Sequence, residues 1–239
     1  MQKLEQLLQK YTDRSGSETE ANVLYAELNS LVSSKKHVAL QPQIREFGIL
    51  FSDILGFTSM TENYPVYAVV QLLNYYFRTM IAIIDSHGGT VDKFMGDSVM
   101  ALFDSEKQGK PIESLLHCVI DMQLAMDQVN LYGSSLGLPE VFMGIAGNYG
   151  AMVACELGSE IYNERTVLGD QVNLTSRLCA FCLRGQVLIS ESLYQRARDI
   201  VQLGNVTEVR VKGKDQLLKV HEILGLKLPS GKMLPVRDI

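Results

Sequence analysis

The sequence predicts a mixed α/β (α+β) fold whose elements follow one another in the order β-α-β-β-α-β. From residue 46 onward, short apolar runs of strand length alternate with longer stretches in which apolar residues recur every three or four positions. Within this alternation, the pair Gly96-Asp97 separates two apolar runs, and such a pair is common in tight hairpin turns. The order is that of a ferredoxin-like core, and later apolar runs add strands at its C-terminal end.

The first half of this order consists of a strand, a helix and a hairpin. Residues 47–54, FGILFSDI, form the buried strand, and the hairpin runs from Thr90 to Phe103. The helix is predicted by one apolar stripe at helical spacing, which comprises Val69, Leu73, Phe77, Met80 and Ile84. The same window is the most apolar long one, but polar residues interrupt it, so we expect no membrane span.

The second half begins with another helix and continues through several strands. The helix has an apolar stripe made of Ile112, Leu115, Val119, Met122, Met126 and Val129. The elements expected after it are strands at 141–147 and 151–156, a helix after Gly169, a strand at 186–190, and a hairpin of 207–213 with 216–223.

The chain is expected to divide into three parts. Residues 1–40 form an N-terminal helical extension, in which leucines at positions 24, 28 and 31 mark one helix face. This extension is either a packing or dimer-contact arm or a signal-transmitting helix. Residues 41–225 form the main domain, and the tail 226–239 gives no clear structural signal.

Composition excludes several classes of function. The formal net charge is -5 and no long Lys/Arg block occurs, which argues against a nucleic-acid partner. The N-terminal residues are polar and amphipathic, unlike a signal peptide, so we expect a cytoplasmic protein. Four cysteines in 239 residues do not make a disulfide framework. Cys179 and Cys182 form a lone CxxC, for which structural thiols are the expected role and a metal or redox site the alternative.

Two aspartates are candidates for a metal site. Asp53 ends the first buried strand, and Asp97 lies at the tip of the hairpin. If the two strands are neighbours, both carboxylates reach one place, where oxygen ligands suit Mg²⁺ or Mn²⁺. Each aspartate also has a simpler interpretation, as a cap or a turn residue.

A second candidate group lies in 166-TVLGDQVNLTSR-177. Asn173 and Arg177 are four residues apart and therefore share one helix face. Arginine can hold phosphate oxygens with its planar fork, and asparagine can orient a hydroxyl. A solvated polar face is the alternative for this pair. The sequence has no phosphate loop of the GxxxxGK[ST] type.

Four segments together resemble the catalytic domain of class III nucleotidyl cyclases. They are 51-FSDILGFT-58, 92-DKFMGDSVMALF-103, 166-TVLGDQVNLTSR-177 and 211-VKGK-214, and they occur in the order that is typical of this family. The resemblance extends from about Phe47 to Ile223 and makes 41–225 the expected catalytic domain.

The resemblance implies a role for each matching position. Two Mg²⁺ or Mn²⁺ ions per site would be bound by Asp53, Asp97 and the backbone carbonyl of Ile54. The other matches are Lys93 and Thr166 for the purine, Asn173 for the ribose, Arg177 for the transition state and Lys212 for the triphosphate. In this family the metal-binding aspartates come from one protomer and the remaining groups from its partner, so a homodimer with two equivalent sites is expected.

The implied reaction is the conversion of ATP to 3′,5′-cyclic AMP and pyrophosphate. Lys93 favours ATP over GTP, because guanylate cyclases typically carry Glu at this position. A guanylate cyclase and a regulatory cyclase-like domain that binds nucleotide without turning it over are the alternatives. Thr166 also resembles the branch that often responds to bicarbonate. Cys155, Arg165 and Gln171 depart from the common family pattern, and Cys155 could alter strand geometry near the site.

Overall fold

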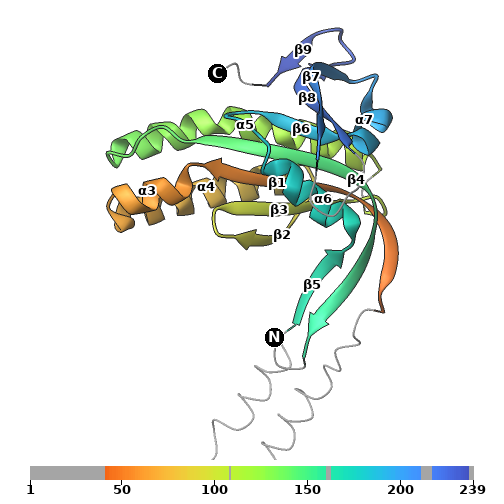
Figure 1. Cartoon of the computed structure of the whole chain (residues 1–239), viewed down its shortest axis with the longest axis horizontal. Coiled ribbons are helices and arrows are strands. Elements are labelled where there is room, and N and C mark those ends of the chain that lie inside the picture. The colour runs from red at the N-terminus through yellow and green to blue at the C-terminus, as the bar shows by residue number, and fades with distance from the viewer. Residues whose placement is uncertain (1–40, 108, 160–162, 211–216, 237–239) are drawn as a thin grey trace, which may run out of the picture. The chain divides into compact units, whose positions relative to one another are not determined.

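A computed structural model of the chain describes residues 41–107, 109–159, 163–210 and 217–236 (Figure 1). All of these except Ser159 belong to one compact unit. The predicted N-terminal helices and Lys212 lie outside the described residues.

The described part begins with the core order that the sequence predicts. Its elements are β1 (Gln43–Leu55), α3 (Phe57–Asn63), α4 (Val66–Ser86), β2 (Thr90–Met95), β3 (Ser98–Asp104), α5 (Pro111–Ser135) and β4 (Phe142–Gly158). The elements that follow are β5 (Asn163–Leu168), α6 (Asp170–Cys179), β6 (Val187–Ser190), α7 (Glu191–Ala197), β7 (Val201–Val209), β8 (Leu218–Lys227) and β9 (Met233–Pro235). The mixed α/β fold class is therefore confirmed.

One sheet joins the described strands. Its order is β2-β3-β1-β4-β6-β8-β7, with β5 paired to β4 and β9 paired to β8. β1 lies antiparallel between β3 and β4, whereas β4 and β6 are parallel. The central position of β1 places its C-terminal end beside the β2–β3 turn, where the predicted aspartates lie.

The two faces of the sheet bury different helices. Along β1, Leu50 and Ile54 pack in the core that contains α4, α5 and α7. The alternate residues Ile49 and Phe51 pack in a second cluster with Leu178 of α6. Figure 1 shows α6 on the face of the sheet opposite α4 and α5. Asp53 continues the alternation of Ile49 and Phe51 and therefore belongs to the α6 face.

The predicted helix stripes agree with the structure except at Ile112 of α5, which is only partly buried, and at two positions of α4. Leu72 and Tyr76 are buried there, whereas the predicted Leu73 and Phe77 are only half-buried against the core. The reason is polar: the Tyr76 hydroxyl lies 3.0 Å from Ser52 Oγ, so this helix face turns toward the sheet. Length and apolar composition alone would allow α4 to cross a membrane, but its buried stripe packs in the core of this domain.

Several predicted boundaries are wrong. The expected strands 141–147 and 151–156 are one strand, β4, which pairs with β1 without a break from Phe142 to Ala154. Asn148, which lies between the two expected strands, is buried and accepts a hydrogen bond from the Ser190 hydroxyl at 2.5 Å. The expected end of the main domain at residue 225 stays a prediction; β8 continues to Lys227, and β9 pairs with it. α3, β5 and α7 were not predicted from the sequence.

Candidate active site

Asp53 and Asp97 meet where β1 ends beside the β2–β3 turn. Ser52 of β1 pairs with Val99 of β3, which brings the turn alongside the end of β1. The backbone N–H of Ile54 donates to Asp97 Oδ2 at 3.1 Å, and the Ser98 hydroxyl donates to Asp53 Oδ1. Gly96 holds a φ of 65° in this turn, a conformation that favours glycine.

The two carboxylates repel each other. Burial raises the pKa of Asp97 above its ordinary value, and the nearby charge of Asp53 raises it further. A divalent cation would relieve this repulsion. Within the described ranges, no three or more His, Cys, Asp or Glu residues form a metal cluster. Two carboxylates and a carbonyl do, however, fit a magnesium-type site that water and substrate phosphates complete.

Lys93 and Thr166 come together from two different strands. Lys93 Nζ of β2 lies 2.5 Å from Glu164 Oε1 of β5. The Thr166 hydroxyl of β5 donates to Asp92 Oδ2 of β2 at 2.8 Å. The hydrogen bond to Glu164 raises the pKa of Lys93, so this side chain stays a cation at neutral pH. The arrangement therefore presents a cation and a hydroxyl next to each other.

A β-bulge in β2 makes this double contact possible. Val91 pairs with Ala101 and Lys93 with Met100, so Asp92 is the extra residue between two successive pairs. In a regular strand, consecutive side chains point to opposite faces. The bulge interrupts that alternation and lets both Asp92 and Lys93 contact β5.

Asn173 and Arg177 lie one turn apart on α6, as expected. Asn173 is exposed and Arg177 is half-buried. The helix is anchored to the sheet near its start, because Asn148 Nδ2 of β4 donates to Gln171 Oε1 at 2.8 Å. Gln171, which departs from the common family pattern, thus helps to position the helix that holds Asn173 and Arg177.

The sequence comparisons decide the family. Residues 40–224 match the family described as the adenylate and guanylate cyclase catalytic domain. The chain belongs to this family. An adenylate cyclase of Anabaena cylindrica is 34% identical over 75% of this chain and 37% of that protein. A terminal-differentiation specific adenylate cyclase of Dictyostelium discoideum is 32% identical over 79% of this chain and 9% of that protein. The chain thus spans well under half the length of these relatives.

Solved cyclase structures resemble the fold closely. The guanylyl cyclase Cya2 is 36% identical, with a TM-score of 0.77 over 82% of this chain and 100% of that one. The adenylyl cyclase CyaB of P. aeruginosa is 28% identical, with a TM-score of 0.73 over 77% of this chain and 96% of that one. The neighbours of this cyclase domain therefore include proteins named for either nucleotide.

The cysteines of this cyclase domain have structural surroundings. Cys155 pairs with Thr166 across a β4–β5 ladder whose register is regular, so it does not distort the strand there. Cys179 and Cys182 are buried free thiols, and their Sγ atoms contact the backbone oxygens of Phe51 and Ile145 at 3.4 and 3.3 Å. Such packing fits the structural role expected for the CxxC pair.

Three site residues were not assigned from the sequence. Ser98 contacts Asp53, while Asp92 and Glu164 contact Thr166 and Lys93. Ser98 and Asp92 lie in the segment 92–103, directly beside the predicted site residues Asp97 and Lys93. This closeness in the sequence could have identified them as candidates. Glu164 lies two residues before Thr166 and shares its face of β5, but that strand was itself not predicted.

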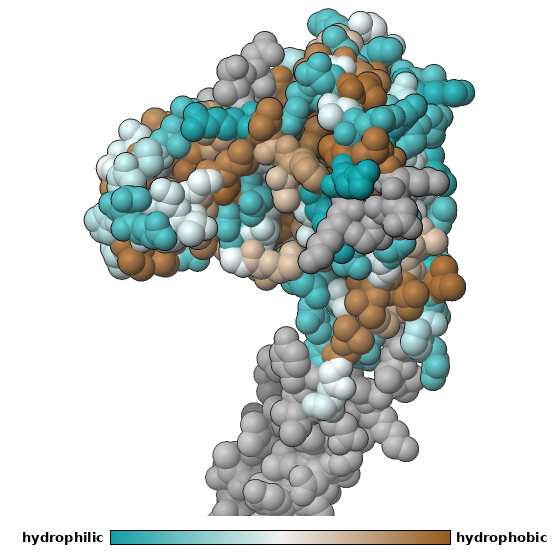
Figure 2. Space-filling view, in the orientation of Figure 1, coloured by the Kyte–Doolittle hydropathy of each residue, from teal (hydrophilic) through white to brown (hydrophobic). Residues whose placement is uncertain are grey.

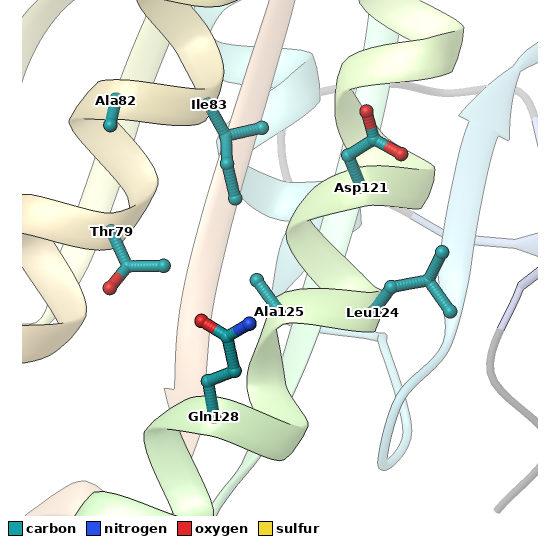
Figure 3. A pocket seen from close by; sticks show the side chains of 7 residues that line it. All are labelled: Thr79, Ala82, Ile83, Asp121, Leu124, Ala125 and Gln128. Atoms are coloured by element: carbon teal, nitrogen blue, oxygen red, sulfur yellow. The ribbon is translucent and has the colours of Figure 1, made fainter.

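A separate hollow of about 400 Å³ lies between α4 and α5 (Figure 3). Its lining includes Thr79 and Ile83 of α4 and Asp121 and Gln128 of α5. None of the predicted cyclase site residues lines it. The hollow is therefore separate from the candidate active site.

Proposed function

We propose that this chain is an adenylate cyclase that converts ATP to 3′,5′-cyclic AMP and pyrophosphate, at sites shared across a homodimer. The observation that supports ATP is that Lys93 and Thr166 share one neighbour: Lys93 Nζ and Thr166 Oγ1 lie 3.5 and 2.8 Å from Asp92 Oδ2. Relatives of Anabaena and Dictyostelium named as adenylate cyclases support the same choice.

Base choice follows from hydrogen bonding. Adenine offers an acceptor at N1 and a donor at N6, and Lys93 can donate to the first while Thr166 accepts from the second. Guanine offers a donor at N1, which a lysine ammonium cannot satisfy because it has no lone pair. The pair therefore favours ATP.

The metal ions are proposed at the acidic pair. Asp53, Asp97 and the backbone carbonyl of Ile54 would hold two Mg²⁺ or Mn²⁺ ions, since these are hard oxygen donors with a surplus of negative charge. When bound, such ions lower the pKa of a nucleophilic hydroxyl and neutralise the charge of a triphosphate.

The remaining groups would act on the ribose and the phosphates. The ribose 3′-hydroxyl attacks the α-phosphorus in line with the departing pyrophosphate. Asn173 would orient the ribose, so that the hydroxyl starts close to the phosphorus. Arg177 and Lys212 would stabilise the negative charge that grows on the phosphorus oxygens and on the leaving group. Water or a phosphate oxygen can take the hydroxyl proton, so no protein general base is invoked.

The homodimer is supported by the division of the site and by exposed apolar surface. Apolar side chains gather at the surface around β5 and the nearby part of β4 (Figure 2). The exposed apolar residues of β1, β4 and β5 include Ile44, Leu157 and Leu168, which are 78%, 43% and 46% exposed. Exposed apolar patches of this kind commonly mark contacts with another protein.

The decisive experiment is the assay of cyclic AMP formed from ATP with Mg²⁺ or Mn²⁺, comparing wild type with Asp97→Ala and Arg177→Ala. We expect activity in the wild type and its loss in each variant. A wild type that binds ATP but forms no cyclic AMP would instead support the regulatory, non-catalytic function.

A guanylate cyclase is the second candidate, because the structurally similar Cya2 is a guanylyl cyclase. Glu164 beside Lys93 is also an acceptor that could bind the N1 donor of guanine. Replacing Lys93 by Glu together with Thr166 by Cys should weaken ATP use and favour GTP. Unchanged ATP turnover in this double variant would contradict the base assignment.

Two further properties extend the proposal. Bicarbonate should raise cyclase activity in a titration at fixed pH. Activity that does not change with bicarbonate would contradict this proposed activation. We also place the reaction in the cytoplasm, where the four free cysteines would stay reduced.

A further inference from the structure

We infer that Asp92 is a positioning residue that sets base selectivity by fixing the direction of the Thr166 hydroxyl. This inference rests on the proposed ATP cyclase function and deepens it. The role differs from that of Lys93 and Thr166, because Asp92 would act on the base only through its neighbour.

The hydrogen bond between Asp92 and Thr166 is built into the fold. The Asp92 side chain is only 3% exposed and Thr166 is 6% exposed, so water competes little for either group. The Thr166 Oγ1 atom lies 2.8 Å from Asp92 Oδ2. The β2 bulge aims Asp92 at β5, and the β4–β5 ladder fixes Thr166 opposite Cys155.

The Thr166 hydroxyl donates this hydrogen bond to Asp92 Oδ2, which is the direction that a carboxylate acceptor requires. A carboxylate has no proton to give, so the hydroxyl must be the donor. Lys93 Nζ lies 3.5 Å from the same Oδ2 atom and favours the charged carboxylate. Burial raises the pKa of Asp92, whereas the Thr166 hydrogen bond and the charge of Lys93 act against that rise.

The Thr166 hydroxyl, which could otherwise donate or accept, can therefore only accept a hydrogen bond from the base. A hydroxyl has one proton and two lone pairs, so a free threonine could donate to guanine O6 or accept from adenine N6. With its proton committed to Asp92, Thr166 presents only lone pairs to the base. These match the N6 amino group of adenine and oppose the O6 lone pairs of guanine. A substrate that leaves a buried polar group of the site without a partner is strongly rejected.

The test is Asp92→Asn, assayed for kcat/KM with ATP and with GTP. An asparagine amide has nearly the same shape, but its N–H can donate to Thr166 and release the hydroxyl proton toward O6. We expect the ATP-to-GTP ratio of kcat/KM to fall about tenfold, the factor that corresponds to one well-placed hydrogen bond. An unchanged ratio would overturn the inference.

A double-mutant cycle separates positioning from a structural effect. In a Thr166→Val background there is no hydroxyl to orient, so Asp92→Asn should leave the ratio unchanged. Thr166→Ser keeps a hydroxyl and should preserve the effect of Asp92→Asn. An equal change in the ratio with valine at position 166, or an equal loss for both nucleotides, would show that Asp92 only supports the fold. Should Asp92→Asn fold poorly by circular dichroism, Asp92→Ser permits the same comparison.

The activity of the wild type separates a failure of the proposed function from a failure of the role inferred for Asp92. A wild type that forms no cyclic nucleotide, or that prefers GTP, contradicts the proposed function itself. A wild type that prefers ATP, with no coupling between positions 92 and 166, contradicts only the role of Asp92.

Discussion

The negative charge of Asp97 destabilises the folded domain. Burial and Asp53 raise its pKa, so the ionised carboxylate destabilises the metal-free domain at neutral pH. This cost disappears as the pH falls through the raised pKa, because the protonated side chain is neutral. Asp97→Asn should therefore raise the melting temperature in a chelator by about 2–4 °C, while Mn²⁺ should stabilise the wild type far more than the variant.

Differential scanning calorimetry with and without Mn²⁺ checks this prediction. Asp85, which is exposed near the end of α4, provides the control. Asp85→Asn should leave both the melting temperature and the Mn²⁺ response unchanged. A chelated Asp97→Asn protein that melts below the wild type would contradict the argument about charge.

Gly144 is a residue whose missing side chain makes room beside the acidic pair. It pairs with Asp53 across β1 and β4, and a Cβ atom there would lie 2.5 Å from Cys182 Cβ. Gly144→Ala should lower the unfolding free energy by about 1–3 kcal/mol, because an overpacked core must shift its backbone. Urea unfolding measures this loss. Gly109→Ala is the matched control, since a Cβ at Gly109 meets nothing within 4 Å.

Single residues also mark the limit of what the sequence could predict. Asp53 and Asp97 could be placed together because each follows or interrupts an apolar strand, and neighbouring strands bring such positions to one edge. Asp92 could not be assigned to the site in this way, because the direction of its side chain depends on a β-bulge that leaves no pattern in the sequence. Alternation alone would have turned Asp92 away from its neighbour Lys93.

Among the elements, periodicity predicted the core helices and the hairpin but not the extent of the strands. β4 passes unbroken through 147-GNYG-150, a composition that is typical of a turn. Long-range partners decide the outcome there: β1 pairs with this segment, and Ser190 satisfies the buried Asn148. Such partners are distant in the sequence, and local propensity cannot include them.

The contact between α7 and β8 is an element-scale feature with a predicted pH dependence. Glu191 at the start of α7 accepts hydrogen bonds from Gln195 at 2.5 Å and His221 of β8 at 2.6 Å. Gln195 and then His221 lower the pKa of Glu191. The stabilisation is therefore present above the unfolded pKa of Glu and is lost as the pH falls through the lower folded value.

Glu191→Gln should accordingly destabilise the domain at pH 7 by less than about 1 kcal/mol, because the glutamate is partly exposed. Melting temperatures measured between pH 3 and 7 should converge for wild type and variant at the acidic end. Glu62→Gln, at an exposed position of α3, should run parallel to the wild type throughout. A difference that grows as the pH falls would contradict the assigned sign.

At the scale of the whole molecule, the proposed site needs two copies of the chain. Lys93 and Asp97 are only four residues apart on one hairpin. The family resemblance nevertheless assigns the acidic pair, Asp53 and Asp97, to one site and the base-contacting pair, Lys93 and Thr166, to the other. A protomer would therefore give its aspartates to one site and its base-contacting residues to the other. Activity should depend on protein concentration, because only the dimer would be complete.

Mixing two inactive variants tests this arrangement directly. Asp97→Ala damages the metal half of a site, and Arg177→Ala damages the other half. A mixed dimer then has one site with both defects and one site with none. Random exchange in an equal mixture makes half of the dimers mixed, so about a quarter of wild-type activity should return. Asp53→Ala mixed with Asp97→Ala is the control, since both changes damage the same half and no site is restored. Failure of the first mixture, with exchange verified by differently sized tags, would mean that each chain builds its site alone.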